Sequence, residues 1–494
     1  MASGRKPTPT RADHEPSVAN PLLRRTVGRM RFLRPVVLLF AVLRQSALAW
    51  CVGGCLLSSA FAGSIISGPM LGYRAHREVF IWIETKDAQK VTLNYWLAGQ
   101  PDTKRTLEQT SPTTTPAGGQ ISHFRPGLLE IGAKYEYSLS LDGVKQDFPF
   151  PTTFQTQALW EWRSPPPDFK FITGSCAYIN DPAYDRPGAP YGKTTRTFEL
   201  MGESGADFMV WLGDNWYYRE PDYDSVSGLW YRPQHDRAIP EMRKLLASMH
   251  HYATWDDHDY GPNDSNWSYE YKAETLKIFQ AYWGNHSYGE AGNPGVYTKF
   301  YWGDAAFFLM DNHYHRDAAA INQDTHPEKT QWGRQQLEWL KQSLIQAKEL
   351  KHFAFKFIAT GTQVLQTELR GEGHAFYQRE REELLQFIRE NKITGVVFLT
   401  GDVHHTGIYR RQLEQDGPWI YELTSSPITA GAWDVEKSSK ANDPTLLKDT
   451  LVGDQNFSTI EVRGPRDARE LIITCTDKQG ATRFTKVIKA AELK

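Results

Sequence analysis

Cysteine is scarce in this chain, which has four cysteines in 494 residues. Cys51 and Cys55 lie in an apolar N-terminal region, whereas Cys176 and Cys475 lie far apart in the body of the chain. Small scaffolds held together by disulfides are much richer in cysteine, so this class is excluded. One disulfide between the two body cysteines remains an open alternative.

An excess of charge of one sign is also missing, because 56 Lys and Arg stand against 58 Asp and Glu. A chain this close to neutral has no general attraction to nucleic acid. Internal repeats and long low-complexity tracts are lacking as well. Aromatic residues, in contrast, are abundant at 13%, with 16 Trp, which predicts a sizeable core and an aromatic-lined cleft. The length suffices for two or three domains.

Residues 1–62 have the pattern of an export leader. A stretch rich in Arg, Pro and Thr precedes an apolar run from Pro35 to Leu43, and a weaker apolar run covers residues 46–62. The second run ends in Ala60-Phe61-Ala62, a small-residue pattern typical of a signal-peptide cleavage site. We therefore predict an exported protein, located in the periplasm, at the cell surface or outside the cell, with no membrane span after cleavage.

Three other interpretations of this leader stay open. Met30 would give a more compact signal than Met1 does. A single membrane anchor is the second, although Arg44 interrupts the apolar span. The third is a lipoprotein-type cleavage at Cys55, which Val52, Gly53 and Gly54 precede.

Residues 63–158 predict a small all-β domain. Strand-like runs cover Glu78–Glu84, Val91–Leu97 and Lys134–Leu141, and the last two alternate as half-buried strands do. Short strands separated by turn residues are typical of an immunoglobulin-like sandwich. Ser164 and the three prolines after it form a linker.

Residues 167–494 predict an α/β domain, because strands and helices alternate there. Predicted strands are 169–173, 208–212, 305–310, 353–359, 395–400, 457–462 and 470–475, and predicted helices are 194–204, 238–249, 273–283, 330–350 and 379–391. In such domains ligands bind beyond the carboxyl ends of the strands. Asp214, Asp257, Asp311 and Asp402 all follow such ends.

Three of these strand ends carry clusters of metal-binding residue types. They are Gly213-Asp214-Asn215-Trp216-Tyr217, Asp256-Asp257-His258-Asp259, and Gly401-Asp402-Val403-His404-His405. Carboxylates packed this closely repel each other unless a cation lies among them. The repetition indicates a metal-dependent hydrolase.

Each cluster also has a simpler interpretation. Gly-Asp after a strand can be a plain turn, and turn chemistry alone can account for Asn263. Asp257 can cap a helix, and His258 can be a structural histidine. Cys176, after Gly174-Ser175, can be a small buried apolar residue or a thiolate ligand. The recurrence of three clusters favours the functional interpretation.

The motifs together resemble the alkaline phosphatase D family of metallophosphoesterases. They are Thr173–Ala177, Trp211–Tyr217, Trp255–Asn263 and Thr400–Thr406. Gly68–Tyr73, with Arg77-Glu78-Val79, resembles the β-sandwich that precedes the catalytic domain in that family. The resemblance implies an α/β fold, an α/β/β/α metallophosphoesterase-like sandwich, preceded by the small all-β immunoglobulin-like sandwich.

The resemblance also implies a two-metal site with Fe³⁺ and Ca²⁺. Iron would be held by Cys176, Asp214, Tyr217 and His404. Calcium would be held by Asp214 as a bridge together with Asp257, Asn263 and Asp402. Thiolate, phenolate and imidazole suit a transition metal, and carboxylate and amide oxygens suit calcium.

The implied reaction is hydrolysis of a phosphate ester by a metal-bound hydroxide. His258 would protonate the leaving oxygen or stabilise its charge, with Asp259 as its orienting partner. Arg316 would clamp the phosphate, since a guanidinium matches its geometry. The chain departs from the family at His313, where an arginine is expected, and at Val403, where a basic residue is common.

We therefore predict an exported phosphodiesterase, alkaline phosphomonoesterase, or both, acting on a small phosphate ester. Two alternatives remain: phospholipase D-type action on phospholipid head groups, and a non-catalytic surface protein that binds a ligand on the same fold. The identity of the ester and its monoester or diester character are not predicted.

Overall fold

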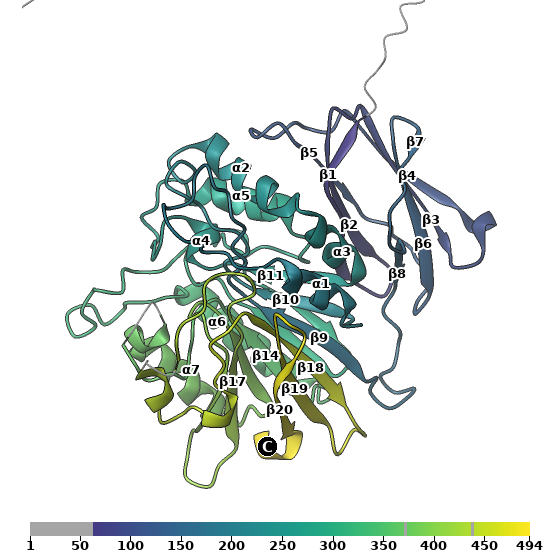
Figure 1. Ribbon diagram of the computed structural model, residues 1–494. Coiled ribbons are helices and arrows are strands. Elements are labelled where there is room, and N and C mark those ends of the chain that lie inside the picture. Colours follow the sequence, from purple (N-terminus) through teal and green to yellow (C-terminus); the bar gives the residue numbers. More distant parts are fainter. Residues whose placement is uncertain (1–62, 370–372, 436–438) are drawn as a thin grey trace, which may run out of the picture. The chain divides into compact units, whose positions relative to one another are not determined.

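The computed structural model describes residues 63–369, 373–435 and 439–494, which belong to one compact unit (Figure 1). The predicted export leader, residues 1–62, lies outside the described residues. None of the helices in the described ranges is long and apolar enough to cross a membrane.

The largest sheet has nine strands and contains segments from both ends of the described chain. Its spatial order is β20 (Thr482–Lys489), β19 (Glu470–Asp477), β18 (Asn456–Arg463), β9 (Phe169–Gly174), β10 (Phe208–Leu212), β11 (His250–Thr254), β1 (Ser64–Arg74), β2 (Val79–Lys86) and β5 (Gln120–Phe124). Strands β9, β10, β11 and β1 run parallel to one another, with Leu71 of β1 opposite His250 of β11.

A second sheet of six strands provides the other half of the core. Its order is β12 (Thr298–Trp302), β13 (Ala305–Leu309), β14 (Phe355–Ala359), β15 (Val396–Thr400), β17 (Trp419–Thr424) and β16 (Gly407–Gln412). Strands β13, β14, β15 and β17 are parallel. Both sheets therefore present several carboxyl ends at one edge, where ligands bind in α/β folds.

Aromatic side chains join the two sheets. Phe171 and Phe208 of the nine-stranded sheet make edge contacts with Phe307 of β13, at ring-centroid distances of 5.3 and 5.4 Å. Alternation along β10 turns Trp211 to the opposite face, against Phe198 of α1. The sizeable core predicted from the abundance of aromatic residues is therefore confirmed.

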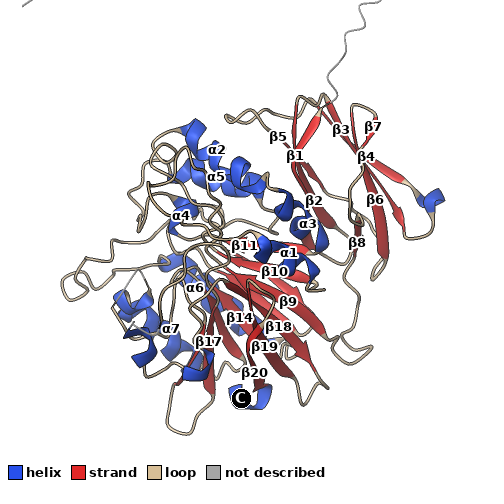
Figure 2. Ribbon diagram, in the orientation of Figure 1, coloured by secondary structure: helices blue, strands red, loops and turns tan. Residues whose placement is uncertain are grey.

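Helices cover the outer faces of the sheets (Figure 2). The helices are α1 (Arg196–Glu203), α2 (Val226–Arg237), α3 (Pro240–Ser248), α4 (Asp257–Tyr260), α5 (Lys272–Tyr282), α6 (Arg334–Glu349) and α7 (Gln378–Glu390). Helices α1 and α3 pack on the side of the nine-stranded sheet, whereas α6 and α7 share a cluster of buried apolar residues with β14 and β15. The mixed α/β architecture predicted from the sequence is confirmed.

The third sheet consists of β4 (Arg105–Thr110), β3 (Lys90–Leu97), β6 (Lys134–Leu141), β7 (Val144–Lys145) and β8 (Thr153–Gln155). Its apolar face packs on β1, β2 and β5 in a core that includes Ile81, Leu93 and Leu139. Residues 63–158 thus form two facing layers, one of which continues through β1 into the sheet of the α/β part. An immunoglobulin-like class for these layers is not confirmed.

Helix α6 begins at Arg334, four residues later than the sequence pattern predicts. Gly333 precedes it with a φ of +80°, a conformation outside the helical region that glycine adopts without strain. The backbone N–H groups of Gln331 and Trp332 donate instead to the carboxylate of Glu380 in α7. This contact fixes the segment before the helix to its neighbour.

Candidate functional site

The predicted metal ligands follow the carboxyl ends of parallel strands in both sheets. Cys176 lies two residues after β9, Asp214 two residues after β10 and Asp257 three residues after β11. Asp402 and His404 follow β15 of the other sheet. Because these ends share one edge of the packed sheets, residues far apart in the sequence come together there.

A first cluster contains the four residues predicted to hold iron. The ligand atoms of Cys176, Asp214 and His404 all lie within 4.8 Å of one another. The phenol of Tyr217 donates to Oδ2 of Asp214 at 2.8 Å and lies 3.4 Å from Nε2 of His404. Cys176 Sγ lies 3.5 Å from the same carboxylate oxygen. The four donors converge on one point.

A second cluster shares Asp214 with the first. Ligand atoms of Asp214, Asp257 and His258 lie within 4.8 Å of one another. Oδ2 of Asp257 accepts from the backbone N–H of Asp264 at 2.8 Å, while its buried Oδ1 has no hydrogen-bond partner among the described residues. An unpaired buried carboxylate oxygen requires a compensating donor or cation, which fits a metal ligand.

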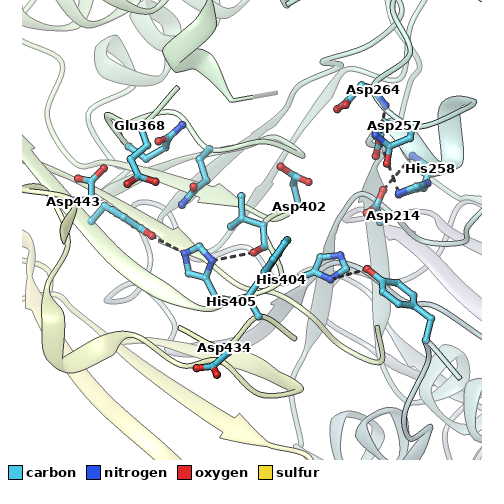
Figure 3. A pocket seen from close by; sticks show the side chains of 17 residues that line it. Asp214, Asp257, His258, Asp264, Glu368, Asp402, His404, His405, Asp434 and Asp443 are labelled. Atoms are coloured by element: carbon cyan, nitrogen blue, oxygen red, sulfur yellow. Dashed lines mark hydrogen bonds and ion pairs between the residues drawn. The ribbon is translucent and has the colours of Figure 1, made fainter. Parts of the chain in front are cut away.

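A cavity of about 810 Å³ opens over these clusters. Asn263 and Asp402, the other predicted calcium ligands, line it together with Asp214 and Asp257. Figure 3 shows Asp214, Asp257 and His258 gathered at one end of the cavity, Glu368 at the other, and Asp402 between them. All seven predicted metal ligands therefore lie at or beside one cavity.

Burial sets the electrostatics of the first cluster. It raises the pKa of the Cys176 thiol to about 12, and it also raises the pKa of the Tyr217 phenol well above its usual value. Burial and the neighbouring acidic groups also raise the pKa of Asp214 well above its ordinary range. In the absence of a cation the Cys176 thiol and the Tyr217 phenol therefore hold their protons at neutral pH, and a bound cation would favour the charged forms of all three groups.

This electrostatics predicts that metal uptake releases protons. The Cys176 thiol and the Tyr217 phenol are protonated at neutral pH, so a cation has to displace their protons and its affinity rises with pH. We expect more than one proton released per transition-metal ion at pH 7. Calorimetric titration in buffers of different ionisation enthalpy measures this number, and a value of zero would contradict the assignment of Cys176 and Tyr217.

Four of the seven candidate ligands have a left-handed backbone. The φ angles of Cys176, Asp214, Asp402 and His404 are +62°, +50°, +66° and +52°. Each such residue costs about 1 kcal/mol or more relative to the right-handed region. Strained backbone of this kind concentrates at functional sites, where the surrounding structure holds side chains in a required direction.

Asp259 does not orient His258, which corrects one prediction. Its carboxylate accepts hydrogen bonds from the backbone N–H groups of Asp214, Asn215 and Asp256, at 3.3, 3.2 and 2.7 Å, and from the Asn215 amide at 2.5 Å. Burial raises the pKa of Asp259 to about 8 against the opposite effect of these donors. Asp259 therefore ties the loop after β10 to the loop after β11.

His258 instead lies against the first cluster. Its ring lies 4.2 Å from the ring of Tyr217, and its Nε2 lies 3.9 Å from Oδ2 of Asp257. The backbone N–H of His258 donates to Oδ1 of Asp214 at 3.2 Å. The side chain lines the cavity, as a residue that meets substrate must.

Arg316 is not placed as a phosphate clamp, which corrects a second prediction. Its side chain is buried and does not line the cavity. Nε donates to the hydroxyl of Tyr377 at 2.9 Å, and another guanidinium nitrogen donates to the backbone carbonyls of Asp264 and Ser265 at 3.0 and 3.1 Å. Arg316 thus supports the loop that carries Asn263.

The residue at the position of the expected arginine, His313, is also buried. Its two ring nitrogens lie 2.8 Å from Oδ1 of Asp256 and 2.8 Å from the carbonyl of Ser265. Asn312 donates to the same oxygen of Asp256 at 2.6 Å. Both side chains therefore fix the residue that precedes Asp257. Val403 lines the cavity with an apolar side chain.

Sequence reasoning did not identify the residues that form the aromatic wall of the cavity. The hydroxyl of Tyr191 lies 3.1 Å from Nδ1 of His404, and Trp433 donates its backbone N–H to the carbonyl of the same histidine. Both residues belong to loops without a motif, and no local pattern distinguishes them from other exposed aromatics. The predicted aromatic-lined cleft has its counterpart here.

Cys176 and Cys475 are both free and buried. The disulfide alternative is therefore wrong, since Sγ of Cys475 contacts Asn456 and Sγ of Cys176 lies in the first cluster. Of the two roles considered for Cys176, the geometry favours the ligand.

The fold is shared with two solved phosphatases. The structure of PhoD superposes with a TM-score of 0.67 at 15% identity, covering 87% of this chain and 91% of that one. A purple acid phosphatase from yellow lupin (Lupinus luteus) seeds superposes with a TM-score of 0.59 at 10% identity, covering 86% of this chain and 74% of that one. At these identities the likeness establishes the shared fold.

The sequence identifies the family. The profile of the PhoD-like phosphatases matches residues 171–468, more than half of the chain. The chain belongs to the PhoD-like phosphatase family. Alkaline phosphatase D of Bacillus subtilis (strain 168) is 24% identical over 302 residues, 51% of this chain and 51% of the relative. The chain thus matches about half the length of this curated relative.

Proposed function

We propose that the chain is an exported, metal-dependent phosphoric ester hydrolase that acts on small phosphodiesters, phosphomonoesters or both. The observation that carries the proposal is the carboxylate of Asp214, which belongs to two adjacent donor clusters on the wall of one cavity. A shared carboxylate between two cation sites is the arrangement used to bind a phosphoryl group between two metals. Export is supported by the leader pattern of residues 1–62.

The donor chemistry suits Fe³⁺ in the first cluster and Ca²⁺ among the oxygen donors around Asp214 and Asp257. Cys176, Asp214, Tyr217 and His404 would hold the iron, and Asp257, Asn263 and Asp402 would join Asp214 around the calcium. When bound, the two cations supply charge to neutralise the phosphoryl oxygens and to activate water.

The side chains of the chain then position the ester. His258 lies on the cavity wall beside Asp257. We propose that its ring nitrogen contacts the leaving oxygen and donates a hydrogen bond or a proton to it. The ring contact with Tyr217 fixes the imidazole plane. Tyr191 and Trp433 provide an apolar wall for the ester group.

The proposal predicts a metal-dependent activity that depends on His258. Elemental analysis should find iron and calcium in the purified protein, and the protein should hydrolyse bis(4-nitrophenyl) phosphate, 4-nitrophenyl phosphate or both. His258→Asn should lower kcat by about 10²-fold or more while the metal content stays the same.

His315→Asn is the matched control, because this half-buried histidine contacts the carbonyl of Pro294 outside the cavity. It should leave kcat unchanged. A metal-replete protein that is inert toward aryl and alkyl phosphate esters would disprove the hydrolase and favour a binding protein on the same fold.

A further inference from the structure

A second cavity, of about 440 Å³, is lined by residues that precede β13 and β14 and by Arg74 at the end of β1. Gly303 and Phe353 in its wall come before β13 and β14, whereas the clusters follow the carboxyl ends of their strands. A five-residue strand is roughly 16 Å long, and no residue lines both cavities. The two cavities are therefore separate.

Arg74, at the end of β1, gives this cavity a positive charge that the described residues do not pair. Its guanidinium carbon lies 3.4 Å from the ring centroid of Trp302. Stacking of this kind leaves the in-plane N–H groups available for an acceptor. Nε is buried and has no hydrogen-bond partner among the described residues. A buried donor without an acceptor is unfavourable, so an acceptor bound beside the guanidinium would stabilise it.

The other polar side chains of the wall are compatible with an anion. Nε2 of His76 is a second buried atom without a partner among the described residues, and His286 and His352 also line the cavity. The Lys299 ammonium is held by Gln346 at 2.9 Å. Glu161 is the one carboxylate among the lining residues.

Asp207 does not line the cavity, but its negative charge raises the pKa of Arg74, whereas burial lowers that pKa. Burial lowers the pKa of Arg74 to about 10, so the guanidinium remains charged at neutral pH.

Aromatic rings form the apolar part of the wall. Phe300 stacks on Tyr252 with a ring-centroid distance of 3.6 Å, and Tyr301 stacks on Phe353 at 4.8 Å. These stacked pairs fix the ring positions. The wall therefore combines a bidentate cation with flat apolar surfaces, as sites for small organic anions do.

We propose that this cavity binds a small aromatic oxyanion. The carboxylate or phosphoryl group would accept two hydrogen bonds from Arg74, and the ring of the ligand would lie against Phe300, Tyr301 and Phe353. This site is distinct from the place where the phosphate ester reacts, and it does not depend on the hydrolase activity.

Calorimetric titrations of the metal-loaded protein with benzoate and with phenylphosphonate test this site and separate the two anionic groups. Wild type should bind at least one probe in the cavity, and Arg74→Gln should weaken that binding at least tenfold. Phenylphosphonate bound at the metal clusters should persist, so its stoichiometry should fall from two to one. Glu161→Gln should tighten binding severalfold, because it removes the negative charge from the wall.

Arg125→Gln is the matched control, since this exposed guanidinium lies 5.5 Å from the Phe80 ring outside the cavity. It should leave affinity unchanged. Equal affinities in wild type and Arg74→Gln, or no binding of either probe by wild type, would overturn the proposal. If Arg74→Gln fails to fold, Glu161→Gln decides, and an unchanged affinity in that variant also overturns it.

Discussion

Asp214→Asn is expected to remove metal from both clusters and to reduce kcat/KM for phosphate esters by at least about 10³-fold, equivalent to about 4 kcal/mol of transition-state stabilisation. The reason is geometric, because this carboxylate is the common member of both donor groups. Replacing one of its oxygens by an amide nitrogen, which is a donor, takes away a ligand atom without changing the size of the side chain. Elemental analysis and steady-state kinetics on the same preparation measure both effects.

Asp443→Asn is the matched control for this experiment. Asp443 lines the same cavity, but its carboxylate accepts from Thr367 and Thr445 and belongs to neither cluster. This variant should keep its full metal content. If Asp214→Asn retains both metals, or turns over the ester at the wild-type rate, the shared-ligand assignment is wrong.

Asp259→Ala is expected to destabilise the fold by about 3–5 kcal/mol and to lower metal affinity at the same time. Four N–H donors would lose their acceptor in a buried place, and each unmet donor costs about 1–3 kcal/mol before the structure relaxes. The loops that carry Asp214 and Asp257 would then separate. Urea unfolding of the metal-free protein measures the first effect, and metal titration measures the second.

Asp259→Asn should be milder, because the amide keeps one acceptor oxygen. Asp102→Ala, at an exposed carboxylate in the turn between β3 and β4, should change the free energy of unfolding by less than about 0.5 kcal/mol. A loss of stability in Asp259→Ala no larger than in this control would show that the carboxylate does not join the loops.

The gathering of the candidate metal ligands at one edge could be predicted because the strands that precede them have local signals. Strand β10 covers Phe208–Leu212 as its apolar run predicts, and Asp214 follows it directly. In contrast, Asp259 and Arg316 have side-chain directions that depend on loops distant in the sequence, so the roles that the resemblance implied for them were wrong.

Other elements had no readable pattern. Helix α2 contains Pro233 and has buried residues without a clear amphipathic period, so propensity argues against it. The pairing of β1 with β11 joins segments far apart in the sequence, and neither strand contains a sequence pattern that identifies its partner. The contact of Tyr191 with His404 could not be predicted either, because the two residues lie 213 positions apart and Tyr191 belongs to a loop.

The continuity of the nine-stranded sheet determines when the protein can become active during its own synthesis. Strand β1 must wait for β11, and β9 is completed on its other side only by β18, near the end of the chain. Cys176 likewise lies 3.5 Å from the backbone oxygen of Asp402. Contacts of such long range form late and slowly, because loop closure precedes them. The proposed metal site therefore stays incomplete in the nascent chain until synthesis has delivered almost all of the chain.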